Sequence, residues 1–378
     1  MAAVSPGFLR PVQDRPLTPG QDAAIARVCP GLGQSVEPGH RTDDVLWGPY
    51  VAMRTGWATD EKARHAGASG GGLSAILVHL VESGVVDAVI QVGACDANPI
   101  GNATIVTSDA STILGAAGSR YAASAPLADL AVRLEEHRAT GRRFAFVGKP
   151  CDAAAMAALR ATDAEIDAAI PVILSFFCGG VPSETGALNV LKALGVMREE
   201  VIAFRYRGNG WPGRATAMLA DGTTRSMSYH DSWGGILSHH VQHRCKICAD
   251  GTGVAADIVC ADAWESDARG YPLFDEAPGV SLIVTRTELG ERLLRQAEDD
   301  GRIETAVFDP TRLAAIQTGQ RERRRALLAR LAALRLVGQP IPRYEGLNLA
   351  AAARQNPLRR NLRNFFGMAR RVLWPRRP

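Results

Sequence analysis

Long apolar segments and abundant cysteines are both missing from this sequence of 378 residues. No apolar run approaches the roughly 18 residues that a helix needs to cross a bilayer, and the longest, such as 170–177, have the length of a strand. The N-terminal MAAVSPGFLRPVQDRP contains no apolar segment of the kind that a secretory signal requires. Seven cysteines are too few and too clustered for a secreted disulfide scaffold. We therefore expect a cytoplasmic protein that keeps its cysteines for chemistry.

The charge is low overall but unevenly distributed. Charged residues make up 22% of the chain and hydrophobic residues 46%, which is ordinary globular composition, and the length allows a large core in two lobes. The net charge is +4, yet residues 354–378 contain eight arginines and no acidic residue, so the rest of the chain carries about −4. Because the basic character belongs to this tail, we do not expect the protein to bind nucleic acid.

The expected strands and helices alternate in a way that is typical of an α/β protein. Strands are expected at 48–56, 87–93, 103–108, 143–147 and 171–177, and helices at 73–82, 126–140, 152–161 and 183–194. Further strands are expected at 204–209, 215–219, 223–228, 256–261 and 281–285, and helices at 230–243, 288–299 and over most of the chain from 310. This order predicts an α/β (α+β mixed) fold, with a mixed sheet flanked by helices in two intimately packed lobes and a helical C-terminal extension.

Four cysteines occupy positions that are typical of a metal or cluster site. Cys245 and Cys248 open the stretch RCKICADGTGVAADIVCADAW with C-x-x-C spacing, which lets two thiolates turn toward one metal group from a single loop. Cys151 in VGKPCDAAA and Cys178 in SFFCGGVPS follow expected strands at turns marked by glycine or proline, and they would complete a set of four. Four thiolates suit a 4Fe–4S cluster or a tetrahedral zinc ion, and on the residues alone both alternatives, as well as unrelated buried thiols, stay open.

A glycine-rich turn precedes the expected helix 73–82. It consists of Ser69, Gly70, Gly71 and Gly72. Glycines let backbone N–H groups approach a phosphate, and the N-terminus of a helix favours negative charge. The turn is therefore a candidate anion cradle, and an ordinary helix start is the alternative.

Four further residues are candidates for cofactor binding. Arg120, Tyr121 and Ser124 supply a cation, an aromatic face and a hydroxyl that a flavin or nucleotide could use. Lys149, beside Cys151, could compensate the negative charge of a cluster or a reduced flavin. A structural role is the alternative for Arg120, Tyr121 and Ser124, and a solvated lysine in a turn is the alternative for Lys149.

The proton donor for a redox reaction is not identified by any motif. The segment 229–243 holds four histidines, His230, His239, His240 and His243, any one of which could donate a proton. No catalytic residue is assigned from the sequence.

The C-terminal tail has the pattern of a basic amphipathic helix. Its apolar residues, which fall at helical spacing, are Leu362, Phe365, Phe366, Ala369 and Leu373. Arginines surround them in the sequence. Such a helix suits the surface of an anionic membrane. Docking to an acidic protein and a solvated terminus are the alternatives.

Six motifs, taken together and in this order, resemble the coenzyme F-420 hydrogenase/dehydrogenase beta-subunit family. They are ASGGGLSAILVHLVESGVVDAV, VGKPCDAAAMAALR, FFCGGVPS, FRYRGNGWPG, RCKIC followed by AADIVCADAW, and GVSLIVTRTELGERLL, and the similarity covers about residues 46–310. The resemblance implies an iron–sulfur flavoprotein oxidoreductase with FAD and a 4Fe–4S cluster. Cys151, Cys178, Cys245 and Cys248 fall on the cluster cysteines of the family, and the turn 69–72 falls on its flavin-binding loop.

The resemblance also implies partners. Electrons would pass from a ferredoxin-like electron donor, or a partner redox subunit, to a small organic acceptor that is F-420-like or unsaturated. Many relatives carry an N-terminal ferredoxin segment with C-x-x-C-x-x-C, of which only Cys29 and Pro30 remain here, so we expect the donor to be a separate protein. The other hypothesis is a metal-stabilised electron-transfer or scaffold subunit of a membrane-associated complex, without its own substrate.

The expected domain organisation follows from the same resemblance. An irregular, degenerate ferredoxin-like segment at 1–45 precedes a flavin-binding α/β domain at 46–148 and an iron–sulfur/flavin domain at 149–310. A helical extension at 311–378 carries the basic tail, and residues 354–378 would let a cytoplasmic protein contact the inner face of a membrane peripherally.

Overall fold

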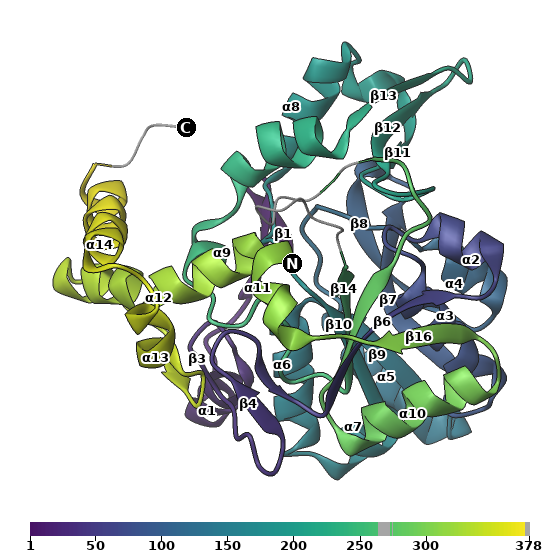
Figure 1. The fold of residues 1–378 in the computed structure, drawn as a ribbon, viewed down its shortest axis with the longest axis horizontal. Helices are drawn as coiled ribbons and strands as arrows, with labels where there is room; N and C mark the ends of the chain where they lie inside the picture. Colours follow the sequence, from purple (N-terminus) through teal and green to yellow (C-terminus); the bar gives the residue numbers. More distant parts are fainter. Residues whose placement is uncertain (264–272, 274, 375–378) are drawn as a thin grey trace.

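An eight-stranded mixed sheet forms the centre of the computed structural model, which describes residues 1–263, 273 and 275–374. The strand order is β16-β6-β15-β14-β10-β9-β7-β8 (Figure 1). The bounds are β6 Ala52–Ala58, β7 Ala88–Cys95, β8 Asn98–Thr107, β9 Phe144–Gly148, β10 Val172–Phe176, β14 Ile258–Asp262, β15 Ser281–Thr285 and β16 Ile303–Val307. The central strands β7, β9, β10 and β14 are parallel, and the strands outside them pair antiparallel. The predicted mixed sheet is confirmed, whereas Trp264 at the end of the last cysteine motif lies outside the described residues.

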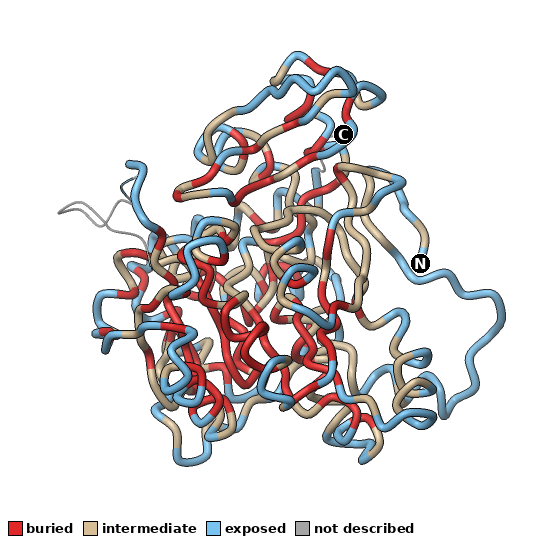
Figure 2. Tube along the Cα trace, turned by 90° about the vertical axis from the view of Figure 1, so that its right-hand side faces the viewer, coloured by how far each residue is buried: buried red, intermediate tan, exposed pale blue. Residues whose placement is uncertain are grey.

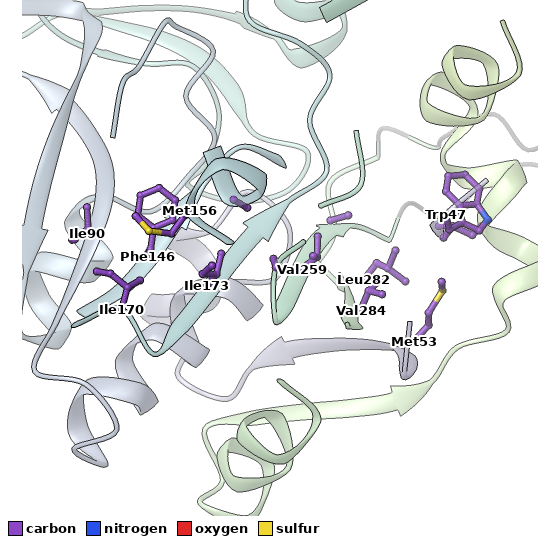
Figure 3. Packing of buried hydrophobic residues seen from close by; sticks show 14 of the residues in the cluster. Trp47, Met53, Ile90, Phe146, Met156, Ile170, Ile173, Val259, Leu282 and Val284 are labelled. Carbon is purple, nitrogen blue, oxygen red and sulfur yellow. The ribbon is translucent and has the colours of Figure 1, made fainter. Parts of the chain in front are cut away.

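Side chains of the central strands alternate between two hydrophobic cores, one on each face of the sheet. Phe146 and Ile173 pack on one face, whereas Val147 and Leu174, the next residues along β9 and β10, pack on the other. This explains why the strands read as continuous apolar runs, since a parallel sheet is covered on both sides. Figure 3 shows part of the first core, where Met156 lies close to Phe146.

Helices cover both faces of the sheet. The first face is covered by α5 Leu130–Thr140, α6 Pro150–Arg160 and α7 Ala164–Ala169, and the second by α3 Gly72–Glu82, α4 Ala110–Gly115 and α10 Glu288–Asp299. Four strands of the sheet come from residues 46–148 and four from 149–310, so the two expected domains share one sheet. The predicted domain boundaries themselves stay a prediction.

A smaller sheet lies over one edge of the large one and has its own core (Figures 1 and 2). It consists of β11 Val201–Arg205, β12 Arg214–Leu219 and β13 Thr224–Ser228, and it packs against α8 Glu184–Leu194. The Ser183 hydroxyl caps α8 by accepting from the Gly186 N–H at 3.4 Å, as the sequence predicts. The strand expected at 204–209 ends earlier, at Arg205, because positive φ angles at Gly208, Asn209 and Gly210 turn the chain.

The helix expected at 230–243 is broken into shorter pieces. A π-helical segment at His230–Ile236 and a 3-10 turn at Leu237–His240 precede a one-turn helix, α9 His243–Lys246. The break occurs where the Ser183 N–H donates to His240 O at 3.0 Å and the Gln242 N–H donates to Val181 O at 3.0 Å. These bonds to the segment that precedes α8 replace the hydrogen bonds of a continuous helix.

The N-terminal segment 1–45, which we expected to be irregular, contains short regular elements. It contains helix α1 Pro19–Val28 and the short strands β1 Ala2–Val4, β2 Phe8–Arg10, β3 Gly33–Ser35 and β4 Thr42–Asp44. Strand β3 pairs with β17 Arg343–Glu345 of the C-terminal extension, so the two ends of the chain support each other. Little in the residue pattern indicates this, because the elements are short and their partners are distant.

The C-terminal extension is helical, as predicted. It consists mainly of α11 Leu313–Ile316, α12 Thr318–Leu336, α13 Leu349–Arg354 and α14 Leu358–Leu373. A separate core holds it to the loop that carries the C-x-x-C, through Ile247, Ala249 and Leu331. Among the described residues, no helix is long and apolar enough to cross a membrane.

A buried carboxylate of α10 joins the edge of the sheet to its helix layer. Glu291 accepts two hydrogen bonds from Arg54 of β6, at 2.6 and 2.9 Å, and one each from Thr285 and Arg295 at 2.8 Å. The pKa of Glu291 is lowered to about 2, and the hydrogen bonds from the Arg54 guanidinium are the largest cause. A carboxyl with such a pKa contributes stability above the pKa of the unfolded chain, and this contribution is lost as the pH falls through the folded pKa.

We predict that Glu291→Gln lowers the free energy of unfolding by about 3 kcal/mol at neutral pH, because it removes one charge of a buried pair. The deficit relative to the wild type should shrink as the pH falls from about 5 to about 2, since the wild-type carboxylate is then protonated. Denaturant titrations over this range measure it, and Glu288→Gln, an exposed change on the same helix, is the control. A deficit that does not change with pH would contradict the prediction.

Candidate cofactor cavity and four-cysteine site

A cavity of about 680 Å³ lies at the carboxyl ends of three parallel strands. Gly148 and Lys149 line it at the end of β9, Phe176 at the end of β10 and Asp262 at the end of β14. Open α/β sheets bind their ligands at this edge, because the loops that follow parallel strands meet there. The cavity therefore lies where the fold favours a ligand site.

The predicted glycine turn forms one wall of this cavity. Ser69, Gly71 and Gly72 line it, and Gly70 lies beside them in the chain. Gly70 and Gly71 have φ angles of 81° and 69°, and a Cβ on Gly71 would lie 2.3 Å from Ala63 O, so a side chain is strained at both positions and has no room at Gly71. The turn is thus shaped by close backbone packing as well as by any ligand.

The N-terminus of α3 opens onto the cavity. Gly71 is the N-cap, and the next three residues, Gly72, Leu73 and Ser74, line the cavity wall. The first N–H groups of a helix have no partner within the helix, so this end favours an anion. One of these donors is already engaged, because the Gly72 N–H donates to the Ser281 hydroxyl at 3.2 Å.

Ser124 and Lys149, which the sequence singled out separately, are brought together. The Lys149 ammonium donates to the Ser124 hydroxyl and to the Asp152 carboxylate, each at 2.6 Å, and all three residues line the cavity. Burial lowers the pKa of Lys149, but Asp152 acts in the opposite direction and the pKa lies above its ordinary value. Lys149 is therefore a fixed, paired cation between the cavity and Cys151, rather than a solvated lysine.

Arg120 also lines the cavity, but its guanidinium is committed to the protein. It donates to the Asn102 side chain at 2.6 Å, to Gly101 O at 2.6 Å, and to Pro99 O and Phe204 O at 3.3 Å. These bonds hold the large sheet to the small one. The role of Arg120 as a cofactor-binding cation stays a prediction, whereas these hydrogen bonds are those of a structural clamp.

Tyr121 belongs to an aromatic wall that the sequence did not reveal. Its ring lies 4.6 Å from the Trp233 ring and 6.4 Å from the Tyr229 ring, and all three line the cavity. The buried Arg207 guanidinium lies 4.6 Å above the Tyr229 ring and pairs with Asp262 at 2.8 Å. Motifs could not show this arrangement, because Tyr121, the pair Tyr229 and Trp233, Arg207 and Asp262 come from four separate segments.

None of the four candidate histidines is among the residues that line the cavity. Within the same segment, Tyr229, Trp233, Ser238 and Val241 line it instead. The ring of His240 lies 3.1 Å from the Asn189 amide of α8, which is a contact within the smaller sheet's layer. The positions of the four histidines therefore do not support a role for any of them as proton donor.

The four predicted cysteines lie close to one another at the other end of the cavity. Cys178 and Cys245 line it, whereas Cys151 and Cys248 are not among its lining residues. In five of the six pairs the two residues are close enough for one thiol to raise the pKa of the other. Thiols from three distant parts of the sequence are thus gathered.

Local structure differs from expectation for two of these cysteines. Cys151 lies in the first turn of α6 rather than in a turn before it, and Cys245 lies in the short helix α9. The Val181 N–H donates to the Cys245 sulfur at 3.4 Å, and the Cys248 thiol donates to Asp250 O at 3.1 Å. Helix N-termini and tight turns both leave donors for sulfur, which is a common environment for metal-binding thiolates.

Burial is the main influence on the pKa of Cys151, Cys178 and Cys248. It raises the pKa of Cys178 to about 12, with the neighbouring Cys245 acting in the same direction, and it also raises the pKa of Cys151 and Cys248. Arg323 opposes this effect at Cys178. Buried thiols of this kind become thiolates when a metal group compensates their charge, so the donor set fits a soft metal group chemically.

Within the described part of the chain, no group of three or more His, Cys, Asp or Glu residues is compact enough to hold a single metal ion. A tetrahedral zinc ion needs its thiolates about 2.3 Å from one centre, whereas the thiolates of a 4Fe–4S cluster are distributed over several irons. The arrangement is a group of neighbouring thiols, and the assignment of the metal group stays a prediction.

Helix α12 fixes the cysteine-bearing turns from outside, a role that sequence reasoning missed. Gln320 and Arg323 each donate to Cys178 O at 2.9 Å, and Arg324 donates to Ala249 O. The Asp250 carboxylate accepts the N–H groups of Thr252, Gly253 and Val254 at 2.8 to 3.1 Å. In the sequence, the arginines at 321–325 could have indicated that this helix contacts the cysteine-bearing turns. Such a basic run is equally typical of a solvated helix face.

Comparison with known proteins places this arrangement in a family. The model described as coenzyme F420 hydrogenase/dehydrogenase, beta subunit N-term, matches residues 53–131, and the model for the C terminus of the same beta subunit matches residues 141–311. Together they cover more than half of the chain.

Individual relatives agree with these matches. The chain is 26% identical over 263 residues to the F420-dependent formate dehydrogenase 1 subunit beta of Methanococcus maripaludis, covering 67% of this chain and 61% of that one, so it spans about three fifths of that relative's length. It is 24% identical over 305 residues to the coenzyme F420 hydrogenase subunit beta of Methanococcus voltae, covering 78% and 99%.

A solved structure supports the fold. A chain of the F420-reducing NiFe hydrogenase complex from Methanosarcina barkeri matches with a TM-score of 0.56 and 21% identity, covering 76% of this chain and 96% of that one. At this identity the likeness concerns the fold alone. The two family models nevertheless decide the assignment, and the chain belongs to the coenzyme F420 hydrogenase/dehydrogenase beta-subunit family, a family of oxidoreductase subunits.

Proposed function

We propose that this protein is an iron–sulfur flavoprotein oxidoreductase that binds FAD in the cavity and a 4Fe–4S cluster at Cys151, Cys178, Cys245 and Cys248. Electrons would come from a ferredoxin-like donor or a partner redox subunit and leave on a small organic acceptor, of the F420 kind or an unsaturated substrate. The observation that carries the proposal is one continuous cavity, which has the glycine turn on one wall and Cys178 and Cys245 on another.

The two cofactors would divide the chemistry between them. A cluster exchanges single electrons, whereas a flavin can exchange one or two. Bound side by side, they would allow single electrons from the donor to be delivered to the acceptor in pairs. The residues of the chain supply the setting. Lys149, held by Asp152 and Ser124, keeps a positive charge between the two sites, and the positive end of α3 favours the phosphates of the flavin.

The aromatic wall would exclude water from the reaction. Tyr121 and Trp233 give the cavity an aromatic side, and aromatic rings favour stacking or edge contacts with planar ligands. Arg207 is held over Tyr229 by Asp262, so its charge is neutralised locally. This part of the cavity therefore suits a planar organic ring better than an anionic group.

The electron donor would bind at a group of cations beside Cys245. Lys246 follows this cysteine, and the Arg330 guanidinium donates to Lys246 O at 2.8 Å. Burial lowers the pKa of Lys246, and the nearby Arg371 and Arg330 lower it further, so like charges are held together here. Such a surface attracts an acidic electron carrier and speeds its encounter. It therefore supports a separate protein donor.

Cofactor analysis tests the proposal directly. Protein purified without oxygen should contain one FAD and about four irons per chain. Cys245→Ser should lose most of the iron and the visible absorption of the cluster, whereas Cys29→Ser, which changes a cysteine outside the four, should keep both. One zinc ion per chain and no flavin would instead support the alternative, a metal-stabilised scaffold or electron-transfer subunit.

The flavin site can be tested by charge alone. Ser74 is the third residue of α3 and lines the cavity, so Ser74→Glu stabilises the helix N-terminus but places a negative charge beside the proposed phosphate site. We predict that it weakens FAD binding by about tenfold relative to Ser74→Gln, which has nearly the same size. Flavin titration by fluorescence measures this, and equal affinities of the two variants would contradict the site.

The proposed docking site predicts that the rate of reduction by the donor depends on salt. Arg371→Glu reverses one exposed cation of the group beside Cys245. With an acidic ferredoxin as donor, the rate of protein reduction should fall by about threefold to tenfold at low ionic strength and approach the wild-type rate at high salt. Arg359→Glu, an exposed change near the start of the same helix, is the control. A wild-type rate in Arg371→Glu at low salt would argue against this docking site.

A further inference from the structure

Helix α14 carries a second apolar stripe that the protein does not cover. Leu358, Leu362, Phe366 and Leu373 are 74%, 47%, 64% and 54% exposed. The first three are four residues apart and therefore follow one side of the helix, and Leu373 returns to the same side after two further turns. Large exposed apolar side chains are normal when scattered, but a continuous stripe marks an interaction surface.

The helix is nevertheless fixed to the body of the protein through a neighbouring face. Met368 is buried, and Phe365, Ala369 and Val372 pack with it against the core shared with α12. Figure 1 shows α14, in yellow, at the outer edge of the molecule. Because the face that contains Met368 holds the helix in place, the exposed stripe lies on a rigid element and cannot turn inward.

Arginines follow the outward stripe. Arg359, Arg363 and Arg370 are exposed and lie roughly 20° to 140° around the helix from the apolar residues. Arg360, by contrast, pairs with Glu322 of α12. Residues 354–378 contain eight arginines and no acidic residue. The outward surface therefore combines apolar side chains with positive charge and has no acidic residue of its own.

We propose that this surface, Leu358, Leu362, Phe366 and Leu373 with Arg359, Arg363 and Arg370, binds the protein peripherally to an anionic lipid bilayer. A helix with such a surface lies in the plane of the interface, with its apolar side chains among the acyl chains and its cations at the headgroups. Arginine suits the boundary, because its stem can lie along apolar surface while the guanidinium stays with the phosphates. The cations beside the apolar stripe give this surface the charge complementarity that an anionic bilayer requires.

Vesicle sedimentation with the full-length protein tests this proposal and does not depend on the redox cofactors. The wild type should bind vesicles that contain about one third phosphatidylglycerol at least about tenfold more tightly than vesicles of phosphatidylcholine alone. Leu362→Ser with Phe366→Ser should lose about tenfold or more of the binding. Both side chains are exposed, so the double variant should keep the wild-type melting temperature.

Two control variants separate the contributions. Leu336→Ser with Ile202→Ser removes two exposed apolar residues from other elements and should bind like the wild type. Arg359→Gln with Arg363→Gln should reduce the preference for anionic vesicles while the apolar stripe remains.

Three results would overturn the proposal. They are absence of vesicle binding by the wild type, equal binding of neutral and anionic vesicles, and unchanged binding by the Leu362→Ser, Phe366→Ser variant. Light scattering on the same samples tests the alternative that a second copy of the chain covers the stripe. A wild-type dimer that this variant converts to a monomer would assign the stripe to a second copy of the chain.

Discussion

The bond between the Cys178 N–H and Gly251 O, at 2.9 Å, joins the two turns on which the candidate site depends. Cys178 follows β10, whereas Gly251 follows the C-x-x-C, so the bond connects segments that are far apart in the sequence. On the other side of the same residue, Gln320 and Arg323 of α12 hold Cys178 O. The backbone of this cysteine is therefore fixed at both its donor and its acceptor, and the positions of the neighbouring thiols follow from it.

The sheet explains why these turns meet. Because β9, β10 and β14 are parallel and in register, the segments that follow β9 and β10 leave the sheet at one edge. The loop after the C-x-x-C then runs back alongside β10, where the Asp257 N–H donates to Ile173 O at 2.7 Å and the chain enters β14. A Cβ on Gly253 would lie 3.0 Å from the Ser175 side chain, so glycine permits this close approach. Sheet topology and loop packing together gather the cysteines.

Sequence reasoning located the features that lie within a few residues and missed those that depend on tertiary contacts. The glycine turn, the four cysteines and Lys149 are recognisable because each stands in a motif of a few residues, and periodicity predicted most of the strands and helices. The pair of Arg207 and Asp262 and the contact of Tyr121 with Trp233 join distant segments, so no local pattern marks them. Arg120 shows the opposite case. The sequence marks this cation clearly, but it does not show that the guanidinium donates to Gly101 O and to the Asn102 side chain.

The C-terminal extension connects the site to the surface of the molecule. Helix α12 contacts the cysteine-bearing turns on one side and packs against α14 on the other. On α14 itself, Arg371 lies near Lys246, whereas Phe366 points outward, roughly 140° away around the helix axis. A donor protein beside Cys245 and a lipid surface along the outer stripe would therefore use different sides of one helix. Because α14 is rigidly packed, contact on the outer side would set the direction from which a donor approaches the thiols without blocking it.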